Sequence, residues 1–388
     1  MKIFVILSRV PYQLDKGDKL RAFNQIKQLS KNNEIILFAL DDKNIDEKKL
    51  DELKKYCVSI IVIKLSKFTI LVNLIRSFFN GNPFQVGYFY SRKALRKLDD
   101  LILKHHPDHI YCQLIRTAEY AKNYSNIPKT LDYMDVFSKG MERRKSTESF
   151  FLKPIFAMEY RRLLKYEHDV FQYFNNKTII SEQDKNLIQH PQKQEIKVIP
   201  NGVDTDYFKP VSREKEFELL FNGNMNYPPN IESVEFLVNK IMPLVWKKKP
   251  QVRLLISGSS PNNKVLALRS DRVVVSGWKE DIRENFAISK ILVAPMQISI
   301  GLQNKLLEAM AMQLPCVTST LANNALGAKH NEQIMVADTL DQYAQYIITL
   351  LENEEKAKQI GLNGYHFVID NFNWQSTTNV LEKLFYAT

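Results

Sequence analysis

Short apolar runs alternate with stretches of helical period along the whole chain, and this series occurs twice. In the first half, KIFVILS, EIILFAL and VSIIVIKL are each bounded by turn-forming or charged residues. FELLFNG, VRLLISG and ILVAPM belong to a second series of the same kind. Continuous apolar strands separated by helices are typical of parallel sheets that helices cover on both faces. The sequence therefore predicts an α/β protein with two Rossmann-like, doubly wound domains.

The length of 388 residues supports this division, because one hydrophobic core rarely serves so long a chain. We predict an N-terminal domain over residues 1–185 and a C-terminal domain over 196–370. A terminal helix over 371–388 is placed against the first domain. Open α/β sheets bind ligands at the carboxyl ends of their strands. Two such domains facing a cleft would therefore carry the functional residues along that cleft.

The formal net charge of +11 favours an anionic partner, which could be a nucleic acid, an anionic membrane surface or a phosphorylated substrate. The cations are spread along the chain and form no basic tail. The three cysteines have neither disulfide nor metal-ligand spacing, so reduced thiols in the cytosol are expected. The apolar segment 68–79 is too short to span a bilayer. We therefore expect a cytoplasmic protein.

One strand, loop and helix carry the strongest indication of a binding site. ILVAPM predicts a strand, Gly301 lies in the loop that follows, and NKLLEAMAM predicts a helix. The free amides and the dipole at a helix start attract an anion, and Lys305 adds a cation there. Glu308 lies one turn further on the same face and could accept the hydroxyls of a ribose. The alternative is a surface ion pair between Lys305 and Glu308, which would stabilise little.

Two C-terminal motifs and two N-terminal motifs carry a family resemblance. VIPNGVDTDYF (198–208) and GLQNKLLEAMAMQLPCVTS (301–319) resemble the C-terminal half of family 4 glycosyltransferases. These are retaining enzymes of the GT-B fold, which use nucleotide-sugar donors. LSRVPYQLDKGDKLRAFNQIKQLS and LDYMDVFSKGMERR resemble a bacterial subgroup of sugar transferases associated with exopolysaccharide clusters. The resemblance covers most of the chain and implies a sugar transferase.

The resemblance also assigns donor-binding roles. Glu308 matches the second glutamate of the family's E-x7-E pattern, which binds the ribose, whereas the first glutamate falls on Ile300. Asn224 stands roughly where the family often has a cation that holds the diphosphate. The diphosphate would therefore depend on Lys305 and the helix start. The predicted donor site comprises Gly17, Asn224, Trp278, Gly301, Gln303, Asn304, Lys305, Leu306 and Glu308.

Two of these positions have competing interpretations. The family's glycine in the first loop passes close to the donor phosphates, and Gly17 matches it. Its neighbour Asp18 is equally well explained as the N-cap of the following helix. In the family, the loop at Trp278 meets the nucleobase, on which an aromatic ring could stack. A core or hinge role for Trp278 explains that residue equally well.

Candidates for contacts with the sugar or the acceptor lie in the N-terminal half. Asp132 and Asp135 end a predicted strand and could bind sugar hydroxyls, or they could cap a turn. The family histidine that contacts the sugar has no clear equivalent, so Gln113 or Arg116 would substitute for it. We therefore predict Lys305 as the catalytic group on the leaving diphosphate, with Asp135 and Arg116 as further catalytic candidates. His105, His106, His109 and His168 are expected at the surface.

No cofactor and no metal site are predicted. Asp204 and Asp206 imitate a D-x-D metal motif, but they lie in a linker signature where aspartates usually cap a turn. The only small molecule expected besides the acceptor is the nucleoside diphosphate sugar, which is a co-substrate. We therefore expect metal-independent catalysis.

The residues and the resemblance together predict a retaining transfer of sugar to an acceptor sugar, which we expect to be lipid-linked, in surface polysaccharide or glycoconjugate synthesis. Stretches 78–93 and 151–174 mix large apolar residues with cations. They could lie on the cytoplasmic face of the inner membrane or pack on the sheet with their cations outward. The alternatives are a GT-B nucleotide-sugar epimerase and, more remotely, a basic nucleic-acid-binding protein. We expect no nucleic-acid partner.

Overall fold

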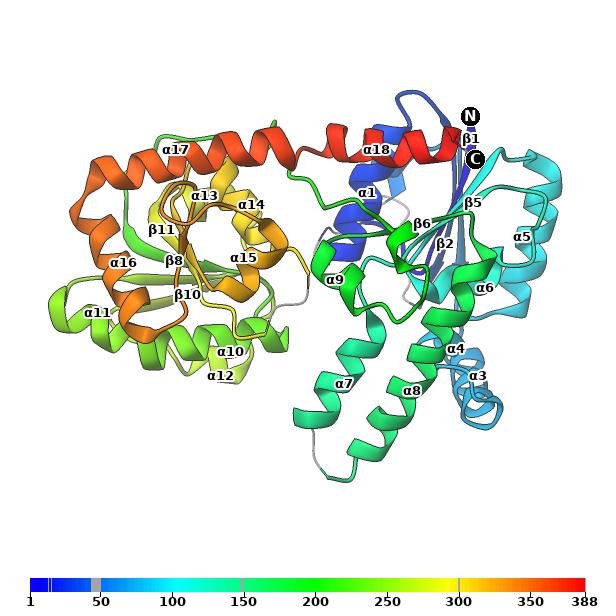
Figure 1. The fold of residues 1–388 in the computed structure, drawn as a ribbon, viewed down its shortest axis with the longest axis horizontal. Coiled ribbons are helices and arrows are strands. Elements are labelled where there is room, and N and C mark those ends of the chain that lie inside the picture. Colours follow the sequence, from blue (N-terminus) through cyan, green and yellow to red (C-terminus); the bar gives the residue numbers. More distant parts are fainter. Residues whose placement is uncertain (13, 15, 43–49, 148–149, 299–300, 388) are drawn as a thin grey trace. The chain divides into compact units, whose positions relative to one another are not determined.

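A computed structural model gives the fold of the chain and describes every residue except 13, 15, 43–49, 148–149, 299–300 and 388. The chain divides into two compact units (Figure 1). The first comprises Met1–Pro200 and Thr377–Thr388, and the second comprises Asn201–Ser376. Each unit is built on one parallel sheet, as the alternating apolar runs predict.

The sheet of the first unit has the strand order β3-β2-β1-β4-β5-β6-β7. All its pairs are parallel, with β1 at the centre between β2 and β4. β1 and β2 are buried along almost their whole length, which explains their unbroken apolar sequences. The strands are β1 (Lys2–Leu7), β2 (Glu34–Asp41), β3 (Ser59–Lys64), β4 (His109–Gln113), β5 (Lys129–Asp132), β6 (Asn176–Ile179) and β7 (Lys197–Val198).

Helices connect these strands, and α7 and α8 form a hairpin that projects from the sheet of this unit (Figure 1). The α-helices are α1 (Gly17–Leu29), α2 (Asp51–Lys54), α3 (Lys67–Asn80), α4 (Phe84–Phe89), α5 (Arg92–His105), α6 (Ala118–Ala121), α7 (Phe137–Thr147), α8 (Lys153–Asp169) and α9 (Glu182–Leu187). The 3-10 turns are η2 (Ile115–Thr117), η3 (Val170–Tyr173) and η4 (Lys193–Glu195).

The second unit repeats the plan with the strand order β10-β9-β8-β11-β12-β13, again all parallel. Its strands are β8 (Phe217–Asn222), β9 (Leu254–Ser257), β10 (Val273–Gly277), β11 (Ser289–Ala294), β12 (Cys316–Thr318) and β13 (Met335–Val336). Its helices are α10 (Pro228–Phe236), the π-helix η5 (Leu237–Ile241), α11 (Met242–Lys248), α12 (Asn263–Leu266), α13 (Arg283–Ala287), α14 (Asn304–Ala311), α15 (Thr320–Leu326), α16 (Leu340–Glu352) and α17 (Glu354–Asn371).

The last helix, α18 (Trp374–Tyr386), contributes Leu381 and Phe385 to the core of the first unit. His109 is fully buried there, with its ring stacked 4.3 Å from that of Phe385 and its Nε2 2.9 Å from Thr130 Oγ1. The prediction of a surface position for His109 is therefore wrong. Burial lowers the pKa of this imidazole to about 4, so it is neutral at physiological pH.

One turn of α8 holds the corner between α3 and α4. Arg162 donates to the carbonyls of Ser77 and Phe78 at the end of α3, at 2.9 and 2.8 Å. Glu159 accepts the backbone amides of Phe84 and Gln85 at the start of α4, at 2.8 and 3.0 Å. A cation at a helix C-terminus and an anion at a helix N-terminus each match the local helix dipole. The two side chains therefore fix α3 and α4 against α8.

No helix in the described part of the chain is long and apolar enough to cross a membrane.

Candidate functional site

Lys305 lies at the carboxyl edge of the second sheet, in the first turn of α14. Its ammonium donates to Oδ1 of Asn230 at 2.6 Å and lies 4.4 Å from the ring centre of Phe221 in β8. The residue is only 7% exposed. No ion pair joins it to Glu308 among the described residues, so the alternative of a surface ion pair is wrong. An ammonium has three donors, which leaves capacity for an anionic ligand.

Burial shifts both ionisable groups of this helix toward their neutral forms. It lowers the pKa of Lys305 to about 7, against the attraction of Glu308. It raises the pKa of Glu308 to about 7, against the attraction of Lys305. Both groups are therefore close to half-ionised at neutral pH, and a nearby anion would favour the charged lysine. Perturbed groups of this kind are concentrated at functional sites.

The start of α14 keeps its backbone amides free of a side-chain cap. Gln303 occupies the N-cap position without a capping hydrogen bond from its side chain. Gly301 in the preceding loop has a φ of 67°, a left-handed conformation that favours glycine. Asn304 accepts a hydrogen bond from Nδ2 of Asn201 at 3.2 Å, which ties the helix start to the 198–208 motif. Ile300 lies outside the described residues.

Asn230 connects Lys305 to the loop after β8. Its Nδ2 donates to the carbonyl of Asn224 at 2.9 Å while its Oδ1 accepts from Lys305. A Cβ on Gly223 would lie 2.7 Å from Nδ2 of Asn230, so a larger residue here would displace the amide that Lys305 contacts. Asn224 is one of the predicted donor-site residues, and this contact brings its backbone close to Asn230. Asn230 itself was not predicted, because nothing in the sequence pairs it with Lys305 across 75 residues.

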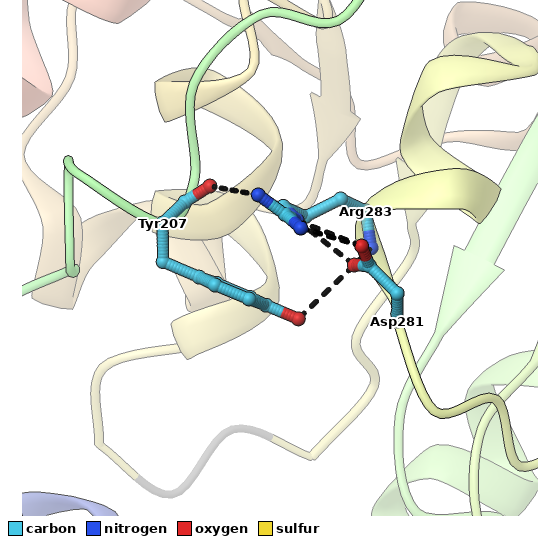
Figure 2. Close-up of polar contacts among 3 residues, drawn as sticks. All are labelled: Tyr207, Asp281 and Arg283. Carbon is cyan, nitrogen blue, oxygen red and sulfur yellow. Dashed lines mark hydrogen bonds and ion pairs between the residues drawn. The ribbon is translucent and has the colours of Figure 1, made fainter.

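Trp278 follows β10 on a loop that a polar cluster stabilises. The indole is 69% exposed, so the alternative of a core role is wrong. A few residues further on, Arg283 pairs with Asp281 at 2.6 Å, and the hydroxyl of Tyr207 donates to Asp281 at 3.0 Å (Figure 2). Hydrogen bonds from Arg283 hold the pKa of Asp281 at about 2. The cluster anchors the loop at its end and leaves the indole accessible.

The paired aspartates of the linker form a turn. Oδ1 of Asp204 accepts the amides of Asp206 and Tyr207, each at 3.1 Å. This confirms the turn-capping interpretation of Asp204. Over the described residues, no group of three or more His, Cys, Asp or Glu side chains could hold a metal ion.

In the first unit, Asp132 has a structural role. It forms an ion pair with Arg21 at 2.6 Å, and both side chains are fully buried. The hydroxyl of Tyr111 lies 2.8 Å from the same carboxylate. Asp132 is therefore not available to bind a sugar hydroxyl, and that alternative is wrong. The sequence could not reveal the pair, whose members lie 111 positions apart.

Asp135 is half-buried beyond the same strand. Its Oδ1 accepts the amide of Val136 at 2.7 Å, as the capping alternative predicts. Burial, together with the charge of Asp184, raises the pKa of Asp135 to about 6. A carboxyl group with a pKa near neutrality can exchange a proton with a ligand.

The loop before α1 also differs from one prediction. Gly17 is the first residue of α1, and a Cβ there would meet no atom within 4 Å. Asp18 does not cap this helix, because the N-cap position belongs to Lys16. The carboxylate of Asp18 instead pairs with Arg9 at 3.0 Å. The N-cap interpretation of Asp18 is therefore wrong.

Arg116 lines a cavity of about 340 Å³ within the first unit. The guanidinium donates to Oε1 of Gln85 and lies 5.1 Å from the ring centre of Phe89 and 4.6 Å from that of Phe137. Burial and the charge of Arg9 lower the pKa of Arg116 to about 10, so it remains charged at neutral pH. The predicted residues thus fall into two groups: Lys305, Glu308, Asn224 and Trp278 belong to the second unit, and Gly17, Arg116 and Asp135 belong to the first.

Solved structures of glycosyltransferases share this fold over the whole chain. The structure of Anabaena Alr3699/HepE in complex with UDP superposes with a TM-score of 0.73 at 14% identity, covering 100% of both chains. The structure of TarM has a TM-score of 0.73 at 13% identity, covering 99% of this chain and 98% of that chain. The fold is therefore the GT-B architecture of two Rossmann-like domains, as predicted.

Sequence comparison identifies the second unit more closely. Residues 216–353 match the family model described as Glycosyl transferases group 1, and they include the site around Lys305. A Klebsiella pneumoniae protein described as "Uncharacterized 44.6 kDa protein in cps region" is 25% identical, covering 96% of each chain. "Uncharacterized glycosyltransferase MJ1069" of Methanocaldococcus jannaschii is 22% identical over 58% of this chain and 64% of its own length. The chain thus has a GT-B fold, and residues 216–353 of its second unit match glycosyl transferases group 1.

Proposed function

We propose that the protein is a retaining glycosyltransferase of family 4, which transfers a sugar from a nucleoside diphosphate donor to an acceptor sugar in surface polysaccharide or glycoconjugate synthesis. The observation that carries the proposal is the buried ammonium of Lys305 beside the uncapped start of α14. It lies inside the segment that matches the glycosyl transferases group 1 model. The relative from a cps region, which covers almost the whole chain, supports a role in polysaccharide synthesis.

The donor would lie along the carboxyl edge of the second sheet. Lys305 and the amides at the start of α14 bind the diphosphate, because both present positive charge. Glu308, one turn deeper, accepts the ribose hydroxyls. Trp278 offers an exposed ring on which the nucleobase stacks. HepE, whose structure has this fold, was solved in complex with UDP, which supports a nucleoside diphosphate as a ligand of this chain.

Catalysis would depend on stabilising the leaving diphosphate. In the same-face mechanism that the family resemblance implies, the leaving diphosphate takes the proton of the acceptor hydroxyl. The protein then mainly positions both reactants and stabilises negative charge. Lys305 supplies a fixed cation for that charge, so no metal ion is required. Asp135 could serve at the acceptor, because its pKa of about 6 allows proton exchange near neutral pH.

The acceptor would be a lipid-linked sugar at the cytoplasmic face of the membrane. α3 exposes a row of large apolar side chains, and the tip of the α7–α8 hairpin exposes another, including Phe151 at 87%. α3 and α8 are held together, because Arg162 of α8 donates to carbonyls at the end of α3. The row on α3 comprises Phe68, Leu71, Val72, Ile75, Phe78 and Phe79, and the hairpin tip comprises Phe150, Phe151, Leu152 and Ile155. The chain as a whole has a formal net charge of +11, so its attraction to an anionic bilayer would add to the insertion of this apolar surface.

A thermal-shift panel of UDP- and GDP-sugars tests the donor assignment. A donor that binds only the folded protein raises its melting temperature, and we expect one nucleotide-sugar to do so. Mass spectrometry after incubation with a glycan acceptor should then detect an adduct. Conversion of the donor sugar without an adduct would indicate the epimerase. Salt-sensitive binding of single-stranded RNA without nucleotide-sugar binding would indicate the nucleic-acid-binding protein.

A further inference from the structure

The cavity in the first unit lies at the carboxyl edge of its sheet. Arg9 follows β1, Asp42 follows β2 and Arg116 follows β4, and all three side chains line it. Parallel sheets bind ligands at this edge. The volume of about 340 Å³ lies in the range of small-molecule sites. The residues that line the cavity all belong to the first unit, whereas the residues of the Lys305 site belong to the second.

Two guanidinium groups lie close to the same aromatic ring in this cavity. The ring of Phe89 lies 5.1 Å from the guanidinium carbon of Arg116 and 5.7 Å from that of Arg9. Arg9 has Asp18 as its counter-ion. Among the described residues, no carboxylate pairs with Arg116, whose side chain donates only to the neutral amide of Gln85. A half-buried cation without a counter-ion, close to a second cation, favours an anionic ligand.

Each acidic residue of the cavity accepts hydrogen bonds from protein donors. Asp42 accepts a hydrogen bond from the hydroxyl of Tyr88 at 2.7 Å. Glu159 accepts the first two amides of α4 and lies in the field of Arg162. The same contacts fix Gln85, which accepts from Arg116. The guanidinium is therefore held in place before a ligand arrives, which reduces the entropy that binding must spend.

The outer wall of the cavity is apolar. Leu74 of α3 and Ile155 and Phe156 of α8 line it. These residues belong to the same two helices that expose the apolar rows described above, and Ile155 itself is exposed at its outer side. An apolar chain leaving the cavity would thus meet apolar side chains of α3 and α8, with Arg144 beside the ring of Phe156.

We propose that this cavity binds a phosphate group that is attached to an apolar chain, as in an acceptor sugar carried on an isoprenyl phosphate. Arg116 and Arg9 bind the phosphate oxygens, and the apolar wall contacts the first units of the chain. The inference rests on the proposed function, since it specifies the chemical class of the acceptor. Arg116 thereby becomes an acceptor-binding residue that positions the substrate, whereas Lys305 remains the group at the leaving diphosphate.

Isothermal titration of the full chain with farnesyl phosphate tests the proposal. Farnesol, inorganic phosphate and glucuronate serve as comparison probes. We expect farnesyl phosphate to bind at least tenfold more tightly than each of the three. If farnesol binds as tightly as farnesyl phosphate, the cavity does not recognise the phosphate group. If inorganic phosphate binds as tightly, the cavity does not recognise the apolar chain. Tighter binding of glucuronate than of farnesyl phosphate would overturn the proposal in favour of an acidic sugar.

Variants locate the binding. Arg116→Gln and Arg9→Gln should each weaken farnesyl phosphate binding at least tenfold. The matched control is Arg272→Gln, because Arg272 also stacks on an aromatic ring, 4.1 Å from Trp246, but in the second unit. Unchanged affinity in both test variants would overturn the proposal. The nucleotide-sugar thermal shift is measured on the same samples, so a chain that binds donor but not farnesyl phosphate loses this inference alone.

Discussion

The ammonium of Lys305 in α14 donates a hydrogen bond to Oδ1 of Asn230 in α10, at 2.6 Å. This contact joins the helix start that carries the proposed diphosphate site to the loop after β8. It also holds the lysine in a buried position, where charge is unfavourable without an anion. Under the proposed function, we therefore expect donor binding and lysine protonation to be coupled.

Replacing Lys305 by alanine should lower turnover about 100- to 1,000-fold, the usual effect of removing one group that stabilises a developing anion. Initial rates at saturating donor and acceptor measure this. Lys329→Ala is the matched control, because Lys329 is an exposed lysine of the same unit with its own i,i+3 carboxylate, Glu332. Near-normal turnover of a folded Lys305→Ala protein would contradict the assignment.

Donor affinity should rise as pH falls from 8.5 to 6. The pKa of Lys305 is about 7, so the charged form that attracts the diphosphate predominates only below that value. The diphosphate diester of UDP-glucose does not titrate in this range. Glu308, whose pKa is also about 7, loses its negative charge as pH falls, which changes the local charge in the same direction as protonation of the lysine. Because Glu308 raises the pKa of Lys305, Glu308→Gln should shift the midpoint to lower pH. Calorimetric titrations across the range would reveal a flat profile if the lysine is not at the site.

The buried carboxyl group of Glu167 should make the protein less stable at alkaline pH. Burial raises its pKa from 4.5 to about 7, although Ser138 donates two hydrogen bonds to it. The folded state thus binds this proton more tightly than the unfolded state. This difference in proton binding contributes on the order of 3 kcal/mol to the free energy of unfolding. The contribution is complete below pH 4.5 and is lost as pH rises toward 7. Glu167→Gln, which keeps the shape, should reduce the fall in melting temperature between pH 5 and pH 8; an unaltered fall would refute the claim.

The neighbouring residues Asp132 and Asp135 should respond differently to substitution by asparagine. Asp132→Asn leaves the buried guanidinium of Arg21 without its counter-charge, and losing one partner of such a pair costs about 3–5 kcal/mol. Asp135→Asn should cost much less stability, because this carboxyl group has no ion-pair partner in the described structure. It should lower the turnover number, because the proposed proton exchange at the acceptor needs a carboxyl group. Melting curves and rates on both variants separate the effects. Loss of stability in Asp135→Asn with normal turnover would assign it a structural role only.

Removing the apolar tip of the hairpin should weaken membrane binding. The double substitution Phe150→Ser and Phe151→Ser removes two exposed rings, each worth roughly 1.5–3 kcal/mol when fully buried. We expect at least a tenfold loss of co-sedimentation with vesicles that contain anionic lipid. Leu362→Ser, an exposed apolar residue of the second unit, is the control. Equal sedimentation of all three proteins would exclude the hairpin as the contact.

The sheets could be predicted well from the sequence because buried parallel strands consist of unbroken runs of apolar residues, such as Ile35–Leu40 in β2. The short β7 and β13 were not predicted, since two residues carry no such pattern. The start of α14 could also be predicted, because a strand, a glycine and a helix follow one another locally. Such features depend only on residues that are close together in the sequence.

Contacts between distant positions could not be predicted. Asn230 as the partner of Lys305, and Arg21 as the partner of Asp132, depend on which helix packs beside which strand. The burial of His109 likewise depends on Phe385, which lies at the other end of the sequence. The cavity around Arg116 is lined from both halves of the first unit, so no single motif could indicate it.

The corner that Glu159 and Arg162 hold gives the first unit a mechanical linkage. A single turn of α8 holds the end of α3, which carries the apolar row, and the backbone amide of Gln85. Through the side chain of Gln85, the same turn also positions the guanidinium of Arg116. A tilt of α8 would therefore move the apolar row on α3 and the guanidinium of Arg116 together. Any homologous chain that repositions one of them must rebuild the other as well.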